Sequence, residues 1–551
     1  MRVLTRKGAI VGLAAMALVL TACGGGGSTP AASGPASQAP SGPTGSITVN
    51  GSQPENPLIP TATNETGGGN VVDAMWTGLV SYDVDTGAPS NAVAESIESS
   101  DNTNWTIKIK KGWKFHDGSE VKAKNFVDAW NYGAYGPNGQ NNSYFFAPIK
   151  GYDELNPADP DGDGPQAAPT PPTKEMSGLK VVDDYTFTVE LSSPVSVFPV
   201  MIGYSAFVPM PDSFFADPKG FEAKPIGNGP FQFVSFTPSQ SIKLTAFADY
   251  SGADKPKVKD VEFKIYQSLD AAYTDVVANN LDVLDAMPSK ALAGDVWKSD
   301  LQGRSDSHAI SVIQTVTFPL YDKRFQNPQL RKAISEAIDR QKVIDIAFPG
   351  RQPADGWVNP GTDGYKPGVC GEACVYNPEK AKADLAAAGG FTGKLTLGYN
   401  ADGGHKEWVD AVCTSIKNAL AIDCQGKPYP EFGPFRAEVG AKKMTGMFRT
   451  GWQADYPSIQ NYLEPLYATG ASANDGDYSN PEFDNLIKEA AAAKSTEEAN
   501  AKYVAAEEVL TKDMPVIPMW FYVGNFGWSD KVDNVKFNWQ GRVDLTSITV
   551  K

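Results

Sequence analysis

After residue 45, segments with strand periodicity alternate with segments with helix periodicity, and this mixture restricts the folds open to the chain. Alternating apolar and polar side chains predict half-buried strands at 47–49, 105–110 and 185–190. Apolar side chains at helical spacing, several behind Asn-Pro starts, predict helices at 123–132, 327–347, 378–388, 408–421 and 481–510. The pattern is typical of an α/β protein, and roughly 500 residues are enough for two or three domains with sizeable cores.

The first 22 residues have the pattern of a signal peptide. Arg2, Arg6 and Lys7 precede an apolar run at 10–20 that is too short to span a bilayer. The run ends in Leu-Thr-Ala-Cys at 20–23, which resembles the bacterial lipobox, whose cysteine is joined to diacylglycerol and becomes the first residue. From this match we expect Cys23 to be lipidated, and two acyl chains would anchor the protein stably. An ordinary signal peptide with an incidental cysteine is the alternative.

Cys23 and the residues up to 45 form a stretch that is almost entirely Gly, Ser, Thr, Ala and Pro. This composition cannot bury a core and predicts a flexible linker. Beyond it, no stretch is apolar for long enough to cross a membrane. The folded part is therefore expected to stay outside the cell on a tether.

The charge of the chain argues against some partners. Lys plus Arg number 48 and Asp plus Glu number 64, which gives a formal net charge of -16. No basic cluster follows the signal peptide, so nucleic acid and anionic membrane surfaces are poor partners.

Four cysteines remain after Cys23, and in an oxidising compartment they suggest two disulfides with three possible pairings. We favour Cys370 with Cys374 and Cys413 with Cys424, because each pair closes a short local loop. A four-thiolate zinc site is the alternative. The C-x3-C and C-x10-C spacings fit no common zinc pattern, and neither loop contains a histidine.

Catalytic patterns are absent from the sequence. His116, His308 and His405 stand neither in H-E-x-x-H, nor beside a G-x-S-x-G elbow, nor near a plausible catalytic cysteine. The glycines at 227–230 precede a strand pattern rather than a helix, so they predict a turn and no dinucleotide site. We therefore expect a protein that is not an enzyme and needs no cofactor.

One acidic loop matches the opening of an EF-hand calcium loop. Asp159, Asp161 and Asp163 alternate before Gly164, but Thr170 stands where the closing bidentate Glu is required. The surrounding Pro- and Asp-rich stretch at 156–173 shows no helix pattern. We interpret it as an exposed, solvated loop without a metal, with calcium binding as the alternative.

Six segments carry a resemblance when they are taken in order. They are KKGWKFHDG at 110–118, NFVDAW at 125–130, GNGPF at 227–231, NPQLRKAISEAIDR at 327–340, YNPEKAK at 376–382 and GWQADYP at 451–457. Together they resemble the oligopeptide- and dipeptide-binding proteins of family 5, the extracytoplasmic solute-binding proteins of peptide ABC transporters.

The resemblance implies a class II periplasmic-binding-protein-like fold, in which two α/β lobes are joined by crossover strands and an extra subdomain is inserted in the first lobe. By similarity, the first lobe covers 46–90, 200–315 and 514–551, the inserted subdomain 91–199, and the second lobe 316–513. The hinges are then expected near 315–319 and 513–515.

The resemblance also implies a peptide site. A bound peptide brings an ammonium into a closed cleft, where a buried charge needs an opposite charge, and Asp455 matches the family position that receives it. An Asp that caps a turn is the alternative. The other implied ligand-binding residues are Arg449 for a carboxylate, with Lys442 or Lys443 as alternatives, Gly451 and Gln453 for the peptide backbone, Trp452 for a side chain, and Tyr456, Asn64, Glu65, Thr66, Phe521 and Tyr522.

The implied function is capture of oligopeptides outside the cell and their delivery to an ABC permease. We expect a monomer that is lipid-anchored at the extracellular face of the cytoplasmic membrane, in a Gram-positive cell. The alternatives are a relative that binds a metal complex, sugar, opine or siderophore, a peptide-signal receptor without import, and a secreted hydrolase.

Overall fold

The computed structural model describes residues 42–158, 168–430, 432–471 and 473–551. The predicted signal peptide, Cys23, most of the predicted linker and the acidic residues Asp159 to Gly164 lie outside the described residues. Each helix within the described ranges is too short or too polar to cross a bilayer.

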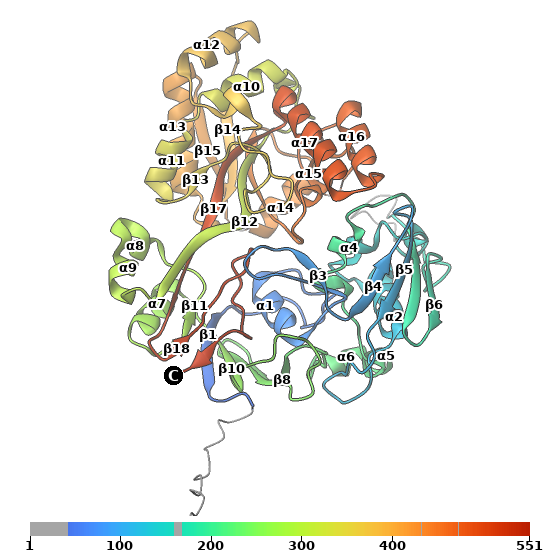
Figure 1. Ribbon diagram of the computed structural model, residues 1–551. Helices are drawn as coiled ribbons and strands as arrows, with labels where there is room; N and C mark the ends of the chain where they lie inside the picture. The colour runs from blue at the N-terminus through green and yellow to red at the C-terminus, as the bar shows by residue number, and fades with distance from the viewer. Residues whose placement is uncertain (1–41, 159–167, 431, 472) are drawn as a thin grey trace, which may run out of the picture. The chain divides into compact units, whose positions relative to one another are not determined.

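An eleven-stranded mixed sheet connects the two halves of the folded chain (Figure 1). Its strands follow the order β15-β14-β16-β12-β17-β11-β1-β10-β9-β8, and β13 pairs with β17. Their bounds are β1 (Ser46–Gly51), β8 (Phe231–Thr237), β9 (Ser241–Ala246), β10 (Asp260–Ile265), β11 (Val283–Leu284), β12 (Ser305–Thr317), β13 (Gln352–Pro353), β14 (Leu395–Asn400), β15 (Cys424–Tyr429), β16 (Met447–Gln453) and β17 (Val516–Trp528).

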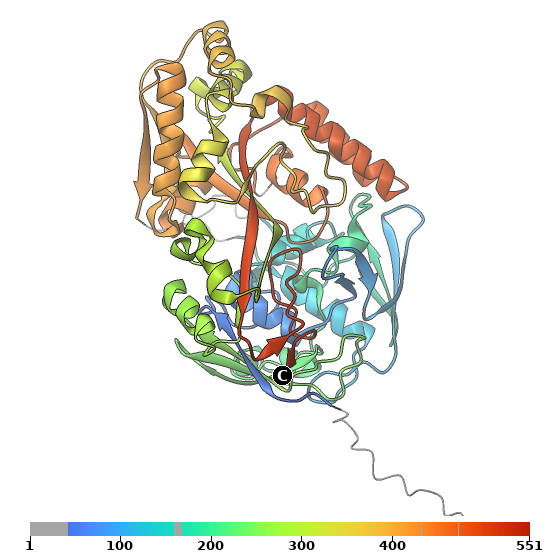
Figure 2. The ribbon, with the colours of Figure 1, turned by 60° about the vertical axis from the view of Figure 1, so that its left-hand side comes forward.

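The two longest strands, β12 and β17, have 13 residues each and run antiparallel to one another (Figure 2). Their register shifts between Ala309 and Ile313, so each strand has two separately paired ends. Phe526 at one end belongs to a first hydrophobic core, whereas Ile313 and Phe521 at the other end belong to a second. Both strands therefore cross from one lobe to the other.

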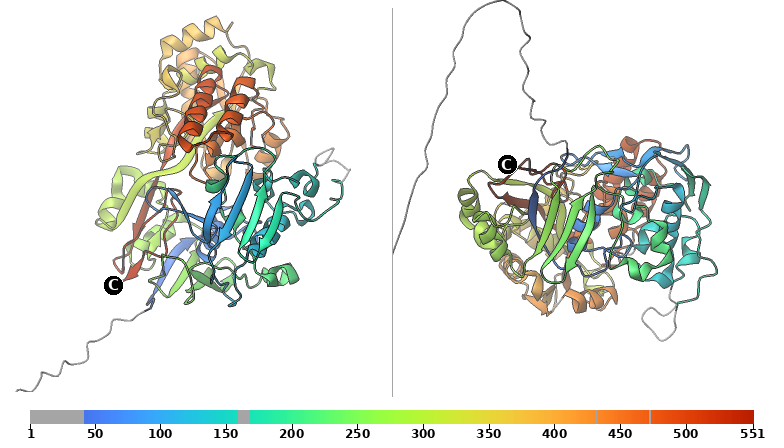
Figure 3. Two further views of the ribbon diagram at one scale, coloured as in Figure 1. Left: turned by 45° about the vertical axis from the view of Figure 1, so that its right-hand side comes forward. Right: turned by 90° about the horizontal axis from the view of Figure 1, so that it is seen from below.

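The first core contains the helix α2 and a separate four-stranded sheet, ordered β4-β5-β7-β6 (Figure 3, left). Trp130 is fully buried there and donates a hydrogen bond from its indole to the carbonyl of Phe207, at 2.9 Å. The elements on this side are α1 (Thr66–Met75), β2 (Val80–Tyr82), β3 (Pro89–Asn91), β4 (Ala94–Glu98), β5 (Asn104–Ile109), α2 (Ala123–Ala134), α3 (Tyr152–Leu155), β6 (Leu179–Asp183), β7 (Thr186–Glu190), α4 (Phe198–Met201), α5 (Asp212–Ala216), α6 (Pro218–Phe221), α7 (Leu269–Val277), α8 (Ser289–Leu292), α9 (Val296–Leu301), β18 (Val532–Asp533) and β19 (Thr549–Val550).

The turn at 227–230 packs against the end of α1, which carries part of the site described below. The backbone N–H of Gly229 donates to the carbonyl of Met75 at 2.7 Å, and a Cβ on Gly227 would lie only 1.9 Å from the same oxygen. The His116 ring accepts from the Gly227 N–H at 3.1 Å and its other nitrogen lies 3.1 Å from the Gly229 carbonyl. Burial lowers the pKa of His116 to about 4. A neutral histidine and a glycine turn thus hold α1 in place.

Helices on the far side of the crossover strands build the second core, except that α14 packs in a small separate cluster. Their bounds are α10 (Pro328–Glu336), α11 (Arg340–Ala347), α12 (Pro378–Ala387), α13 (Lys406–Leu420), α14 (Phe432–Gly440), α15 (Gln460–Tyr467), α16 (Pro481–Ala491) and α17 (Thr496–Asp513).

The predicted strands and helices are confirmed, except that two of the predicted helices are each divided into two separate helices. The stretch 327–347 forms α10 and α11, because the Asp339 carboxylate accepts from the Lys342 N–H and starts a new helix. The stretch 481–510 forms α16 and α17, because Ser495 caps the second helix by accepting from the Glu498 N–H. Strong N-caps inside an apolar repeat interrupted both helices.

Both favoured disulfides are confirmed, and the zinc alternative is therefore wrong. Cys370 is bonded to Cys374 with their Cα atoms 5.7 Å apart, and Cys413 to Cys424 with theirs 4.9 Å apart. The second bond ties α13 to the start of β15.

Replacing both Cys413 and Cys424 with Ser is expected to lower the free energy of unfolding by about 2–3 kcal/mol, because the bond closes a loop of roughly a dozen residues in the unfolded chain. Urea unfolding measures the loss. The double replacement of Cys370 and Cys374 is the matched control, and its shorter loop predicts a smaller loss. A larger loss for the control would contradict the loop-length explanation.

Candidate ligand-binding site

Asp455 lies two residues beyond the end of β16 and is oriented by Asn461 on α15. The Asn461 side-chain oxygen accepts from the backbone N–H of Asp455 at 2.9 Å and from the Trp452 indole at 3.0 Å. The Asn461 amide nitrogen donates to Asp455 Oδ2 at 3.3 Å. Among the described residues, Asp455 Oδ1 accepts no hydrogen bond, so this oxygen is available to a ligand.

The surroundings of the Asp455 carboxyl group make its ionised form unfavourable. Burial raises the pKa of Asp455 to about 7, and the Asn461 amide and the Arg542 guanidinium oppose that rise. A carboxylate with this pKa needs a positive partner to be stable as an anion near neutral pH. The turn-cap alternative does not account for the free oxygen, because the turn is held by Asn461 rather than by Asp455.

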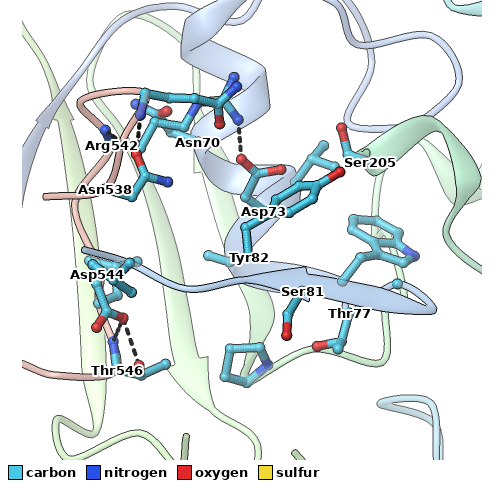
Figure 4. A pocket seen from close by; sticks show the side chains of 18 of the residues that line it. Asn70, Asp73, Thr77, Ser81, Tyr82, Ser205, Asn538, Arg542, Asp544 and Thr546 are labelled. Carbon is cyan, nitrogen blue, oxygen red and sulfur yellow. Dashed lines mark hydrogen bonds and ion pairs between the residues drawn. The ribbon is translucent and has the colours of Figure 1, made fainter. Parts of the chain in front are cut away.

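A cavity of about 290 Å³ lies beside Asp455 and is lined by residues that are far apart in the sequence. Asp73 on α1 forms an ion pair there with Arg542 from the C-terminal segment (Figure 4). Polar and aromatic residues from the first lobe complete the wall, among them Asn70, Tyr82, Tyr204, Ser205, Asn538 and Gln540. The cavity thus joins Asp455, which follows a strand of the second core, to residues of the first.

The strand that precedes Asp455 has an open edge. On one side β16 pairs with β12 from Phe448 to Gln453, whereas on the other side β14 pairs only with Met447 and Phe448. The Ala454 N–H donates to the Ser311 carbonyl at 3.0 Å. Since bonding alternates along an antiparallel strand, the backbone groups of Arg449, Gly451 and Gln453 point toward the open edge.

A second cavity of about 270 Å³ adjoins this edge, and Trp452 and Arg449 both line it. Arg449 donates from Nε to the Asn400 side-chain oxygen at 2.9 Å, and its guanidinium lies 5.3 Å from the Phe432 ring and 5.8 Å from the Phe435 ring. Arg436 makes two hydrogen bonds to Asp475 in the same wall, at 2.7 and 3.1 Å. The walls are otherwise mostly apolar, and Arg449 lies in this cavity rather than in that of Asp455.

The structure places the other residues implied by the resemblance away from both cavities. Glu65 caps α1 by accepting from the Gly68 N–H at 2.8 Å, while Asn64 and Thr66 are exposed beside it. Their contact with a ligand stays a prediction.

Tyr456, Phe521 and Tyr522 also lie outside the two cavity walls. Phe521 is buried in the second core, and the Tyr522 hydroxyl donates to the Gln314 side chain at 3.1 Å. Tyr456 is buried and donates to the Gln460 side chain at 2.6 Å. The alternative cation Lys442 is ion-paired with Asp477.

Sequence reasoning missed Asp73 and Arg542. Neither lies in a segment with a recognisable pattern, and 469 residues separate them along the chain. No signal in a single sequence joins two such positions. The described residues also contain no group of His, Cys, Asp and Glu side chains suited to a metal ion.

The chain matches the family model "Bacterial extracellular solute-binding proteins, family 5 Middle" over residues 88–474, which is more than half of its length. Among curated proteins, it is 26% identical to the oligopeptide-binding protein OppA of Bacillus subtilis, over 96% of both chains. It is also 26% identical to the periplasmic oligopeptide-binding protein OppA of Escherichia coli, over 84% of this chain and 86% of the relative.

Solved structures show the same fold. The murein tripeptide binding protein MppA of Escherichia coli aligns with a TM-score of 0.76 and 22% identity, covering 92% of this chain and 98% of the other. Haemophilus influenzae OppA in complex with RPPGFSPFR aligns with a TM-score of 0.72 and 21% identity, covering 92% and 99%. The predicted two-lobed fold is therefore confirmed. On the match of its central 387 residues, 88–474, the chain belongs to family 5 of the bacterial extracellular solute-binding proteins.

Proposed function

We propose that this protein captures oligopeptides outside the cell and delivers them to an ABC permease. The observation that carries the proposal is the position of Asp455 just beyond the end of β16, a strand with one open edge. A peptide with a free amino terminus offers one ammonium and a backbone that can pair as an added strand, and the two features of the site match these two groups.

The surroundings of Asp455 and β16 support a peptide over a neutral solute. An ammonium next to Asp455 Oδ1 relieves the cost of the buried charge, whereas a sugar cannot. The backbone groups of Gly451 and Gln453 recognise an extended chain without reading its sequence, and the second cavity accepts a side chain. Relatives named as oligopeptide-binding proteins, and one solved as a complex with a nonapeptide, are consistent with this ligand class.

We infer the other parts of the function from the same framework. Lobes linked by two strands can open and close, and a ligand that contacts both lobes selects the closed form for the permease. A diacylglycerol on Cys23 and a linker rich in Gly, Pro, Ser and Ala hold the protein at the extracellular face of the membrane. No chemical step on the peptide is part of this function.

Calorimetry with a free tripeptide and its N-acetylated form tests the proposal. Acetylation removes the ammonium and leaves the half-buried Asp455 carboxylate without that partner, so the acetylated peptide is expected to bind roughly 100-fold more weakly, about 2.7 kcal/mol. Mass spectrometry of solutes that co-purify with the protein identifies which peptides to use in this measurement. Equal affinities for the two forms, or co-purified solutes that are not peptides, would contradict the proposal.

A further inference from the structure

Arg542 lies in the wall of the cavity that contains Asp455. Among the described residues that line this cavity it is the one cation, and its side chain is only 19% exposed. The guanidinium is ion-paired with Asp73, and Figure 4 shows the two side chains joined by this contact. The Arg542 backbone N–H donates to the Asn538 side chain at 2.9 Å, which fixes the root of the side chain as well.

The loop that carries Arg542 is bonded to the segment that carries Asp455. Asn538 and Arg542 close the loop through a backbone hydrogen bond of 2.8 Å. Gln540, at its tip, donates from its side chain to the Ala454 carbonyl at 3.0 Å, and Gln453 donates to the Gln540 carbonyl at 3.3 Å. The position of Arg542 is thus tied to the residue directly before Asp455.

Arg542 is the cation that lines the cavity together with Asp455, and its charge opposes the rise in the pKa of that carboxyl group. The other titratable groups that face Asp455 are the phenols of Tyr82, Tyr144, Tyr204, Tyr456 and Tyr462, which are neutral near pH 7. Asp73 and two further carboxylates, Asp254 and Asp544, line the cavity, and Asp544 is bonded to Thr546. No second cation among the lining residues compensates for them.

We propose that Arg542, held between Asp73 and the loop that Gln540 fastens to Ala454, is a positioning residue that keeps the Asp455 carboxylate charged until a ligand ammonium takes over. The inference rests on the proposed function, because it assigns a partner to the amine anchor. Asp73 shares the guanidinium, and this sharing weakens its hold on Asp455. Arg542 therefore stabilises the Asp455 anion only in part, and a ligand ammonium can add to this stabilisation.

This arrangement predicts how the affinity for a free-amine peptide depends on pH. Binding needs an ionised Asp455 and a protonated ligand amine. Burial raises the pKa of Asp455 to about 7, and a peptide α-amine has a pKa of about 8. Affinity is therefore highest between these values. On the acidic limb of the profile, below about pH 7, Asp455 becomes protonated and the affinity falls about tenfold per pH unit. On the alkaline limb, above about pH 8, the ligand amine loses its proton and the affinity falls equally steeply.

The test follows the acidic limb in wild type and in variants by calorimetry from pH 5 to pH 9. Arg542→Gln removes the nearby positive charge and is expected to move this limb upward by about one pH unit, which lowers the affinity at pH 6 by about a further tenfold compared with wild type. Asp73→Asn frees Arg542 for Asp455 and is expected to move the limb downward. Arg542→Lys retains the charge and should keep the limb near the wild-type position, and the alkaline limb should not move in any variant.

Lys536→Gln is the matched control, because Lys536 lies in the same C-terminal segment and pairs with the exposed Asp85, outside the cavity wall. An acidic limb that stays in place in Arg542→Gln, or that moves in the same direction in Asp73→Asn, would overturn the inference. A purely structural role would lower affinity equally at every pH. If wild type shows no preference for the free amine, the proposed function fails instead, so the two failures are distinguishable.

Discussion

Asp455→Asn is expected to weaken binding of a free-amine peptide by about 3 kcal/mol, roughly 150-fold, and to leave an N-acetylated peptide unaffected. The substitution keeps the shape of the side chain and its bond with Asn461, but it removes the charge that the ammonium requires. Calorimetry at pH 7.5 with both peptides measures the two effects. Equal losses for the two peptides would reject Asp455 as the amine anchor.

The thermal stability of Asp455→Asn shows whether this variant is still correctly folded. Burial raises the pKa of Asp455 from its ordinary value of 3.8 to about 7. A raised acid pKa contributes stability that is present at low pH and is lost as pH rises through 7, so the ionised group disfavours the folded state at pH 8. Asparagine avoids this cost. The thermal midpoint of Asp455→Asn at pH 8 is therefore expected to equal or exceed that of wild type, and a lower midpoint would show structural damage.

Arg340→Met is expected to destabilise the protein by about 3–5 kcal/mol, because a buried guanidinium satisfies several carbonyl groups at once. Arg340 is 3% exposed and donates to the Pro518 carbonyl at 2.7 Å and the Cys374 carbonyl at 3.1 Å. It also donates to the carbonyl and hydroxyl of Ser335, at 3.2 and 2.8 Å. Methionine fills the space but leaves these acceptors buried without a donor.

Urea unfolding followed by circular dichroism measures the effect of Arg340→Met. Burial lowers the pKa of Arg340 to about 10, so the side chain is still charged near pH 7. Arg324→Met is the matched control: Arg324 pairs with Asp322 at the surface, where such a pair contributes at most about 1 kcal/mol. Comparable losses for the two variants would contradict the role assigned to the buried hydrogen bonds.

Local patterns predicted much of the fold. The strand from Ser46 to Gly51 and the helix from Ala123 to Ala134 follow from the spacing of apolar residues, since their periods are set by the backbone. Short loops likewise predicted the two disulfides. The breaks at Asp339 and Ser495 were missed because the apolar repeat continues through them, and a cap decides continuity only when its hydrogen bond is formed.

The site could be predicted only in part. The motif at 451–457 pointed to Asp455 and Trp452, which the structure brings together through Asn461. Arg449 was expected near the same site, but the structure places it in the second cavity, stacked near Phe432. Arg449 lies within β16 and bonds to Asn400 of β14, whereas Asp455 lies beyond the end of the strand, so closeness in sequence does not decide which cavity a side chain enters.

By itself, the sequence determined the α/β class, the family resemblance, the favoured cysteine pairs and the choice of Asp455 as candidate site residue, because each depends on residues close together in the chain or on an ordered set of motifs. Only the tertiary structure decided what surrounds Asp455. Asp73 and Arg542 meet Asp455 because two crossover strands and a C-terminal loop bring three distant segments to one cavity. The pKa of Asp455 depends on burial and on the charges nearby, and both are properties of that assembly rather than of any segment.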